Sequence, residues 1–351
     1  MEAGAGAPAA AAVPPVALDG YGADQGVEVI AAGATAAARD GIPVRIFGPA
    51  GTPLVDGVEL VTCEESISNA EDPVPAVRGR ESASVVQAAQ AVAGGECSAL
   101  VSAGSTGATL AAATLTFRRL RGVVRPGLAA QVPLPPDGSR RLLLLDVGAN
   151  SEARALHLVQ FAFVGAAFGE SILGISSPRV ALLNVGEEPG KGSQPYVDAH
   201  QELSAAQGID FVGNAEGRDL FADVADVMIC DGFTGNIALK GMEGTARAVA
   251  DGVRTAARSG SVSRLGGLLL RPALGDLRQT LDPDATGGAV LLGLRGTAVV
   301  AHGSSGASGI ANAIRLAHRS AREGVPERIA ERLERSGVTR KARRRTPPKS
   351  G

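Results

Sequence analysis

The stretch LLLLDVGAN, residues 142–150, joins four consecutive leucines directly to a short loop of glycine and small polar residues. The same change from an apolar run to such a loop recurs in PPVALDGYGAD (14–24), SALVSAGSTG (98–107), RVALLNVGEE (179–188), ADVMICDGFTGN (225–236) and TAVVAHGSSGASG (297–309). Short apolar runs with little alternation are typical of strands buried on both faces of a parallel sheet. The sequence therefore predicts six buried strands, each ending in a glycine-rich loop.

Helical patterns alternate with these strands. Alanine-rich stretches occupy residues 27–40 and 84–95, a third helical pattern covers 157–172, and segment 44–63 adds two short strands around a Gly/Pro loop. Strands that alternate with helices of 10 to 15 residues indicate βαβ units. With 351 residues, the chain is expected to form two lobes or one large α/β unit.

The six loops predict the kind of site. In an open parallel sheet, ligands bind beyond the carboxyl ends of the strands. Glycine lets backbone N–H groups approach an anion, and a following helix N-terminus adds its dipole. If the six loops converge at one edge, they form a site built mainly from backbone amides, suited to phosphate or an oxyanion.

Composition excludes several classes of protein. Aromatic residues make up 3% of the chain and tryptophan is absent, so recognition of nucleic acid by stacking is not expected. The net charge of -2 provides no general field for polyanions. Three scattered cysteines and four histidines without ligand spacing indicate neither a disulfide framework nor a metal site. No metal or cofactor is expected, and a reducing cytoplasm is the simplest compartment.

The two ends of the chain differ from its centre. Residues 1–13 are rich in Ala, Gly and Pro, lack Lys and Arg, and are expected to be a disordered extension rather than a secretory signal. Residues 337–351 form a basic tail, which either aids solubility or is weakly attracted to anionic lipid. No apolar run reaches the roughly 18 to 20 residues that span a bilayer. The domain is expected to cover residues 14–336.

Residues 237–280 interrupt the alternation and are predicted to form a helical hairpin insert. Its second part places leucines beside arginines between Leu265 and Leu277. Such a segment either packs in a dimer or in the core, or it contacts a membrane interface with its leucines; the two roles are compatible.

Familiar nucleotide motifs do not fit. DGYGADQG spaces its glycines one residue too far apart for a dinucleotide fingerprint, and GEEPGKGS, residues 186–193, has one residue too few between its glycines for a P-loop. No G-x-S-x-G elbow is present. A dehydrogenase and an NTPase are therefore disfavoured.

Three residues in the loops are candidates for catalysis. Lys191 lies between two glycines, where a flexible loop could present its cation, although a lone lysine is usually a solvated charge. Asn236 closes CDGFTGN and could equally be a helix N-cap. His302 opens HGSSGASG with two serines nearby, or is satisfied within its own turn. Asp146 and Asn150 bracket DVGAN, where one of them could also be a cap.

In this order, the motifs resemble the bacterial phosphate:acyl-[acyl carrier protein] acyltransferase family of phospholipid synthesis (PlsX type). The matching stretches include ALVSAGSTGATLAAA, LLLLDVGAN, HLVQFA, RVALLNVGEEPGKG, ADVMICDGFTGN and AHGSSGASGIANAI, and they extend from about Pro14 to about Gly324. The first loop departs from the family pattern at Tyr21 and Ala23, and Ser193 stands where asparagine is common.

The resemblance implies a three-layer α/β/α fold with a mainly parallel sheet, like isopropylmalate dehydrogenases and phosphotransacetylases. It implies a cytoplasmic homodimer, peripherally attached to the inner face of the cell membrane. Such an enzyme transfers the acyl group of an acyl-[acyl carrier protein] to inorganic phosphate, and a glycerol-3-phosphate acyltransferase then uses the acyl phosphate. A non-catalytic scaffold on the membrane is the alternative.

The resemblance assigns catalytic roles to Lys191 and Asn236, with His302 as a further candidate. The loops supply the expected substrate- and phosphate-binding residues: Asp19, Gly104, Ser105, Thr106, Gly107, Asp146, Gly148, Asn150, Glu188, Asp231, Gly235, Ser304 and Ser305.

Overall fold

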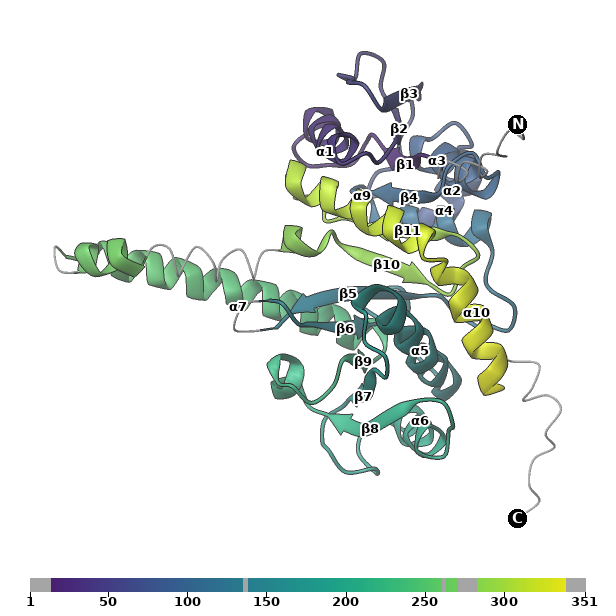
Figure 1. The fold of residues 1–351 in the computed structure, drawn as a ribbon, viewed down its shortest axis with the longest axis vertical. Helices are drawn as coiled ribbons and strands as arrows, with labels where there is room; N and C mark the ends of the chain where they lie inside the picture. The colour runs from purple at the N-terminus through teal and green to yellow at the C-terminus, as the bar shows by residue number, and fades with distance from the viewer. Residues whose placement is uncertain (1–13, 135–137, 261–262, 271–282, 339–351) are drawn as a thin grey trace, which may run out of the picture.

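The computed structural model describes residues 14–134, 138–260, 263–270 and 283–338. The predicted extension, most of the basic tail, and the leucines and arginines at positions 271–278 lie outside the described residues. Eleven strands form one sheet (Figure 1), in the order β3-β2-β1-β4-β11-β10-β5-β6-β9-β7-β8. The strands are β1 (Val16–Asp19), β2 (Val44–Gly48), β3 (Val58–Thr62), β4 (Ala99–Ser102), β5 (Gly127–Pro133), β6 (Arg141–Leu145), β7 (Arg179–Leu183), β8 (Asp210–Ala215), β9 (Val227–Ile229), β10 (Ala289–Leu292) and β11 (Thr297–Val300).

Helices cover both faces of the sheet. They are α1 (Val27–Arg39), α2 (Pro73–Gly79), α3 (Ser84–Ala93), α4 (Thr106–Phe117), α5 (Ala155–Phe168), α6 (Gln194–Ser204), α7 (Gly232–Arg258), α9 (Ala307–Arg322) and α10 (Val325–Ser336), with short helices η1 (Gly169–Leu173), η2 (Gly217–Phe221) and η3 (Pro283–Thr286). One buried cluster joins the sheet to α1, α5, α6, α9 and α10, and a second joins its other face to α2, α3 and α4. The three-layer α/β/α prediction is confirmed.

All six predicted strands are present, but they do not all run in the same direction. β3, β2, β1, β4 and β11 are mutually parallel, and so are β6, β9, β7 and β8. Between these sets, β10 and β5 pair antiparallel to each other and to their outer neighbours. The six loops therefore do not leave one edge of a single parallel array, because three of the strand ends belong to each of two oppositely directed sets.

Helix α5 and the following turn η1 form the most apolar segment described. Residues Ala155–Leu173 are long and apolar enough to cross a membrane by length and composition alone, which the reading of the sequence missed. However, 78% of this segment is buried inside the protein. It packs against β9, α6 and α10, as the core helix of a globular fold does.

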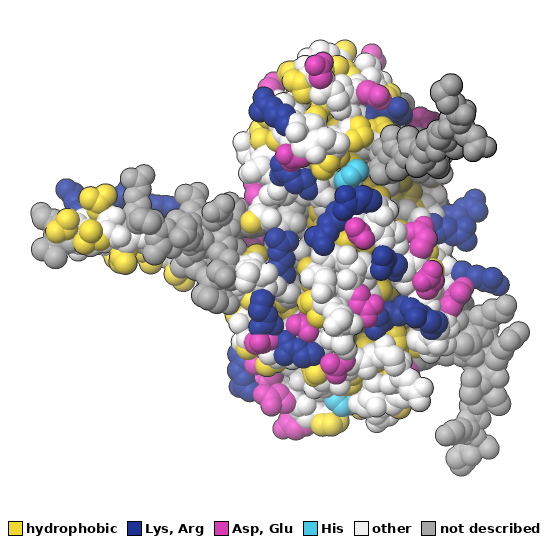
Figure 2. All heavy atoms as spheres, in the orientation of Figure 1, with side chains coloured by type: hydrophobic (Ala, Val, Ile, Leu, Met, Phe, Trp, Pro, Cys, Tyr) yellow, Lys and Arg dark blue, Asp and Glu magenta, His cyan; other side chains and the backbone are white. Residues whose placement is uncertain are grey.

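Helix α7 begins inside the fold and ends outside it. Figure 1 shows it extending away from the body, and residues 263–270 fold back as a helix beside it, with Gly267 close to Ala257. The leucines at positions 265, 268, 269 and 270 are exposed there, and apolar side chains gather at this end of the arm in Figure 2. We call residues 247–260 and 263–270 the arm. The described part of the predicted hairpin is thus mostly helical, and it protrudes only beyond the inner turns of α7.

The three cysteine thiols are buried. Cys63 follows β3, Cys97 precedes β4, and Cys230 follows β9. Burial raises the pKa of the Cys63 and Cys97 thiols to about 11 and that of Cys230 well above its usual range.

Candidate active site

A cavity of about 420 Å³ lies over strands β5 and β10, where loops from the two parallel sets meet. We call it the central cavity. Thr106 comes from the first turn of α4, Gly309 from the first turn of α9, and Asn236 from the second turn of α7. The N-terminal ends of three helices thus border one space. Because the N-terminus of a helix carries partial positive charge, the arrangement favours an anion.

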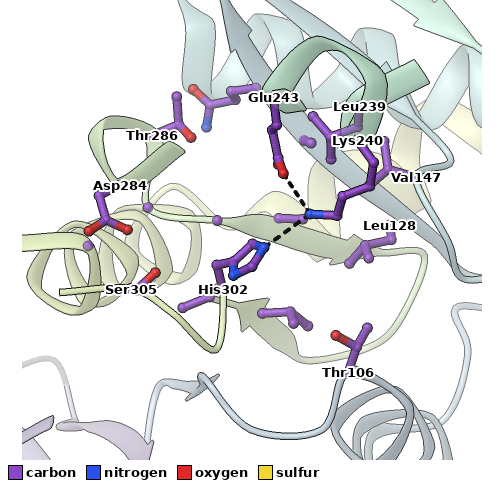
Figure 3. A pocket seen from close by; sticks show the side chains of 18 of the residues that line it. Thr106, Leu128, Val147, Leu239, Lys240, Glu243, Asp284, Thr286, His302 and Ser305 are labelled. Carbon is purple, nitrogen blue, oxygen red and sulfur yellow. Dashed lines mark hydrogen bonds and ion pairs between the residues drawn. The ribbon is translucent and has the colours of Figure 1, made fainter. Parts of the chain in front are cut away.

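Part of the cavity lining is apolar. It consists of Leu128 and Val132 of β5, Val147, and Leu239 and Met242 of α7. Some of these side chains appear in Figure 3. A ligand that fits the whole space therefore has an apolar part and a negatively charged end.

Three polar side chains meet inside the cavity (Figure 3). The Nζ atom of Lys240 lies 2.9 Å from Oε2 of Glu243 and 3.1 Å from Nε2 of His302. On the other side of the ring, Nδ1 of His302 lies 2.8 Å from Oγ of Ser304. Lys240 and Glu243 come from α7, whereas His302 follows β11, so this contact bridges the two halves of the sheet.

The start of α7 is seated tightly on the DVGAN loop. A Cβ atom at Gly235 would lie 1.9 Å from the carbonyl oxygen of Asp146, and one at Gly232 would lie 2.6 Å from that of Asn150. Asp231 caps the helix, accepting a hydrogen bond of 2.8 Å from the backbone N–H of Thr234. These contacts place Asn236 at the cavity, because the helix can approach the loop only where side chains are missing.

Asp146 holds the DVGAN loop together from within. Its carboxylate accepts hydrogen bonds from the backbone N–H groups of Leu128, Gly148, Ala149 and Asn150, at 2.8 to 3.1 Å, and from the side chain of Asn150. Burial is the largest influence on its pKa and raises it, against the effect of these donors. Gly148 and Asn150 belong to the same loop. Asp146 therefore fixes the loop that places Val147 at the cavity, but Asp146 itself does not line the cavity.

Asp19 likewise holds the first loop, DGYGAD, through hydrogen bonds to its buried carboxylate. Its carboxylate accepts hydrogen bonds from Ser84 at 2.6 Å and Ser102 at 2.8 Å, and burial raises its pKa. The first loop also touches the SAGSTG loop, since a Cβ at Gly22 would lie 2.2 Å from the Cα of Gly104. Asp19 and Ser105, the N-cap of α4, border a smaller cavity of about 260 Å³ that shares Gly104 with the central one.

Lys191 lies in the loop between β7 and α6, outside the lining of the central cavity. Its side chain is half exposed, with Nζ 4.0 Å from Oε2 of Glu188. Its backbone carbonyl accepts a hydrogen bond of 2.9 Å from the side chain of Asn184. The loop leads into α6, whose Tyr196 donates a hydrogen bond of 2.6 Å to Asp231 at the start of α7. The two regions are therefore linked through this tyrosine.

The structure brings together part of the predicted set. Five of the predicted residues line the central cavity: Gly104, Thr106, Asn236, His302 and Ser305. Ser304 contacts His302, while Gly107 packs against Pro73. The sequence analysis missed Lys240 and Glu243, which were assigned to the hairpin insert. Their spacing in the sequence could have identified them, because positions 236, 240 and 243 share one face of a helix.

The chain is similar to known proteins over most of its length. The profile of a family described as "Fatty acid synthesis protein" matches residues 15–328. A phosphate acyltransferase of Thermobifida fusca is 43% identical over 344 residues, covering 94% of this chain and 93% of the relative. One of Lactococcus lactis is 39% identical over 332 residues, covering 91% and 98%.

Solved structures share the fold. The EutD phosphotransacetylase from Staphylococcus aureus superposes with a TM-score of 0.55 at 18% identity, covering 88% of this chain and 94% of its own. A branched-chain phosphotransacylase from Enterococcus faecalis gives 0.55 at 16% identity, covering 87% and 99%. Fold and relatives together define an acyltransferase. Within that class, the chain belongs to the phosphate acyltransferase family.

Proposed function

We propose that the protein transfers a fatty acyl group from the thioester of an acyl carrier protein to inorganic phosphate, giving acyl phosphate for phospholipid synthesis. The observation that carries the proposal is the central cavity, in which three helix N-termini and Lys240 border one space together with apolar side chains. Phosphate fits the first part and the thioester-linked acyl chain fits the second.

The reaction makes modest demands on the protein. A phosphate oxygen attacks the thioester carbonyl, the carbonyl oxygen becomes an oxyanion, and the sulfur leaves as a thiolate that takes up a proton. Phosphate itself is the nucleophile, so no nucleophilic side chain has to be acylated. The protein has to hold a dianion in line and stabilise the oxyanion, which positioned amides and cations do well. Asn236 lines the cavity for this purpose.

The test is direct. Purified protein given a long-chain acyl-[acyl carrier protein] and inorganic phosphate should form acyl phosphate, which hydroxylamine traps as a hydroxamate. Product should depend on both substrates. If folded protein binds the acylated carrier protein but forms no product at any chain length, the protein is a non-catalytic scaffold and the proposal fails.

We further propose that the protein works as a homodimer on the inner face of the cell membrane, through its arm. Along the arm, Val249 and Val253 are exposed in addition to the leucines of residues 263–270. The arm thus exposes apolar side chains on both of its helices. Burying these side chains against a second copy of the chain or in lipid would be favourable.

Substitution of Leu268, Leu269 and Leu270 by serine distinguishes contact with the membrane from contact between two copies of the chain. Loss of binding to anionic liposomes, with turnover of a water-soluble acyl donor retained, supports membrane contact. Loss of the dimer in sedimentation with unchanged liposome binding supports packing between copies instead.

A further inference from the structure

Lys240 is the only lysine or arginine among the described residues that line the central cavity. It lies on α7, one turn after Asn236, and its side chain extends between Glu243 and His302 in Figure 3. The other charged residues of the lining are Asp24, Glu243 and Asp284, all acidic. A dianion that enters therefore meets one full positive charge in this lining, that of Lys240, because helix N-termini supply only partial charges.

The partners of Lys240 fix its position and its hydrogen-bonding role. An ammonium group only donates, so Lys240 directs one proton at Nε2 of His302, 3.1 Å away. The other ring nitrogen, Nδ1, contacts the backbone N–H of Ser304 at 3.3 Å and its hydroxyl at 2.8 Å, which holds the ring in place. The ammonium group of Lys240 has three protons, and the contacts with Glu243 and His302 use two of them. The third is available to an oxygen of a ligand.

Glu243 opposes a bound anion in two ways. Its carboxylate, 2.9 Å from Nζ, occupies Lys240 with a negative charge of its own, and only 14% of the Glu243 side chain is exposed. An incoming dianion has to share the lysine with this carboxylate and is repelled by it. Lys240 and Glu243 should therefore affect anion affinity in opposite directions.

We propose that Lys240 is the phosphate-binding cation of the central cavity and that Glu243, by competing for it, sets the affinity for phosphate. The inference deepens the proposed function, on which it rests for the identity of the anion. It assigns Lys191 no part in holding phosphate in the central cavity, since Lys191 does not line it.

Binding of inorganic phosphate alone, measured by isothermal titration calorimetry, is the primary test. Lys240→Gln should raise the Kd at least tenfold, whereas Glu243→Gln should lower it about threefold or more. Lys240→Arg, which keeps the charge, should retain most of the affinity. In turnover assays the same changes should appear in the KM for phosphate, with the KM for the acyl donor nearly unchanged.

The same helix offers a matched control. Arg254 and Asp251 form another ion pair three residues apart on α7, with Arg254 about as exposed as Lys240, but neither residue lines the cavity. Arg254→Gln and Asp251→Asn should leave the Kd for phosphate within twofold of the unmodified protein. Equal effects of the two pairs would mean that helix charge alone is responsible, and would overturn the assignment.

Failure of the inference can be told apart from failure of the proposed function. If the protein forms acyl phosphate and Lys240→Gln binds phosphate normally, Lys240 is not the phosphate ligand. If Glu243→Gln weakens binding, the competitive role of Glu243 is overturned. If the protein forms no acyl phosphate yet binds phosphate in a Lys240-dependent way, the inference holds and the activity does not.

Discussion

Two neighbouring regions of the sheet look alike in sequence and differ in structure. The loop of residues 186–193 follows β7, and the inner turns of α7, residues 232–246, follow β9; each combines closely spaced glycines with one lysine. At the start of α7 the glycines are imposed by contact, since a side chain at Gly235 would overlap the backbone of Asp146. In the loop, a Cβ at Gly190 would meet nothing within 4 Å.

The difference teaches that glycine near a strand end has two separate meanings. At Gly235 it permits close approach of two backbones, whereas at Gly190 it leaves the position beside the chain open. The close approach seats a helix that carries Lys240 into the cavity, whereas the loop leaves Lys191 half exposed and outside it. Substitutions in the two regions can test how far this contrast extends.

The largest effect is expected from Gly235→Ala. The added methyl group would lie 1.9 Å from a carbonyl oxygen and has to push α7 away from the DVGAN loop. We expect the free energy of unfolding to fall by about 3 kcal/mol, measured by urea denaturation. The control, Gly190→Ala, should change it by less than about 0.5 kcal/mol. Similar losses in both variants would remove the distinction between the two regions.

Lys191→Ala should have a slightly smaller effect, on catalysis instead of stability. The family resemblance assigns Lys191 a catalytic role, and removing one donor to an oxyanion typically costs about 100-fold in turnover, or about 2.7 kcal/mol. Steady-state kinetics should show this loss in kcat, while the Kd for phosphate stays unchanged. Near-normal turnover would exclude Lys191 from the mechanism. Of the two lysines compared, only Lys240 would then have a functional role.

The smallest effect is expected where the two regions are joined. Tyr196 of α6 donates to the carboxylate of Asp231 and accepts from its backbone N–H at 2.9 Å, so Tyr196→Phe leaves a half-buried N–H group unpaired. We expect a loss of about 1.5 kcal/mol in the free energy of unfolding. Tyr21→Phe, which removes a single bond to the carbonyl oxygen of Cys63, should cost less in the same assay. The reverse order would mean that the link contributes little.

Much of the fold was predictable from local pattern. Leucine and valine runs marked the six strands, and the alternation with helices indicated βαβ units, while the three-layer class was implied by the family resemblance. Strand direction was not predictable in this way, because buried parallel and antiparallel strands have the same apolar composition. The hairpin of β5 and β6 reverses the chain, and nothing in GLAAQVP (127–133) distinguishes it from a parallel strand.

The candidate site was predicted in part for a related reason. His302 and Asn236 were found because they belong to the glycine-rich motifs HGSSGASG and CDGFTGN, which follow apolar strand runs. Lys240 and Glu243 were missed because they lie inside a long helix, where charged residues are usually solvated. Their role depends on which face of α7 turns toward β11, and only the tertiary structure determines that. Asp146 and Asp19 were recognised as important, but their burial under the loops could not be read from their positions.

The buried thiols described above give the protein an internal set of reporters. A protonated, inaccessible cysteine reacts with an alkylating reagent only when its surroundings open, so labelling rates measure local unfolding. Cys63 and Cys97 sample the strands around β1 and β4, and Cys230 samples the strand end that leads into α7. Mass spectrometry of the alkylated chain would therefore give separate opening free energies for the two halves of one sheet.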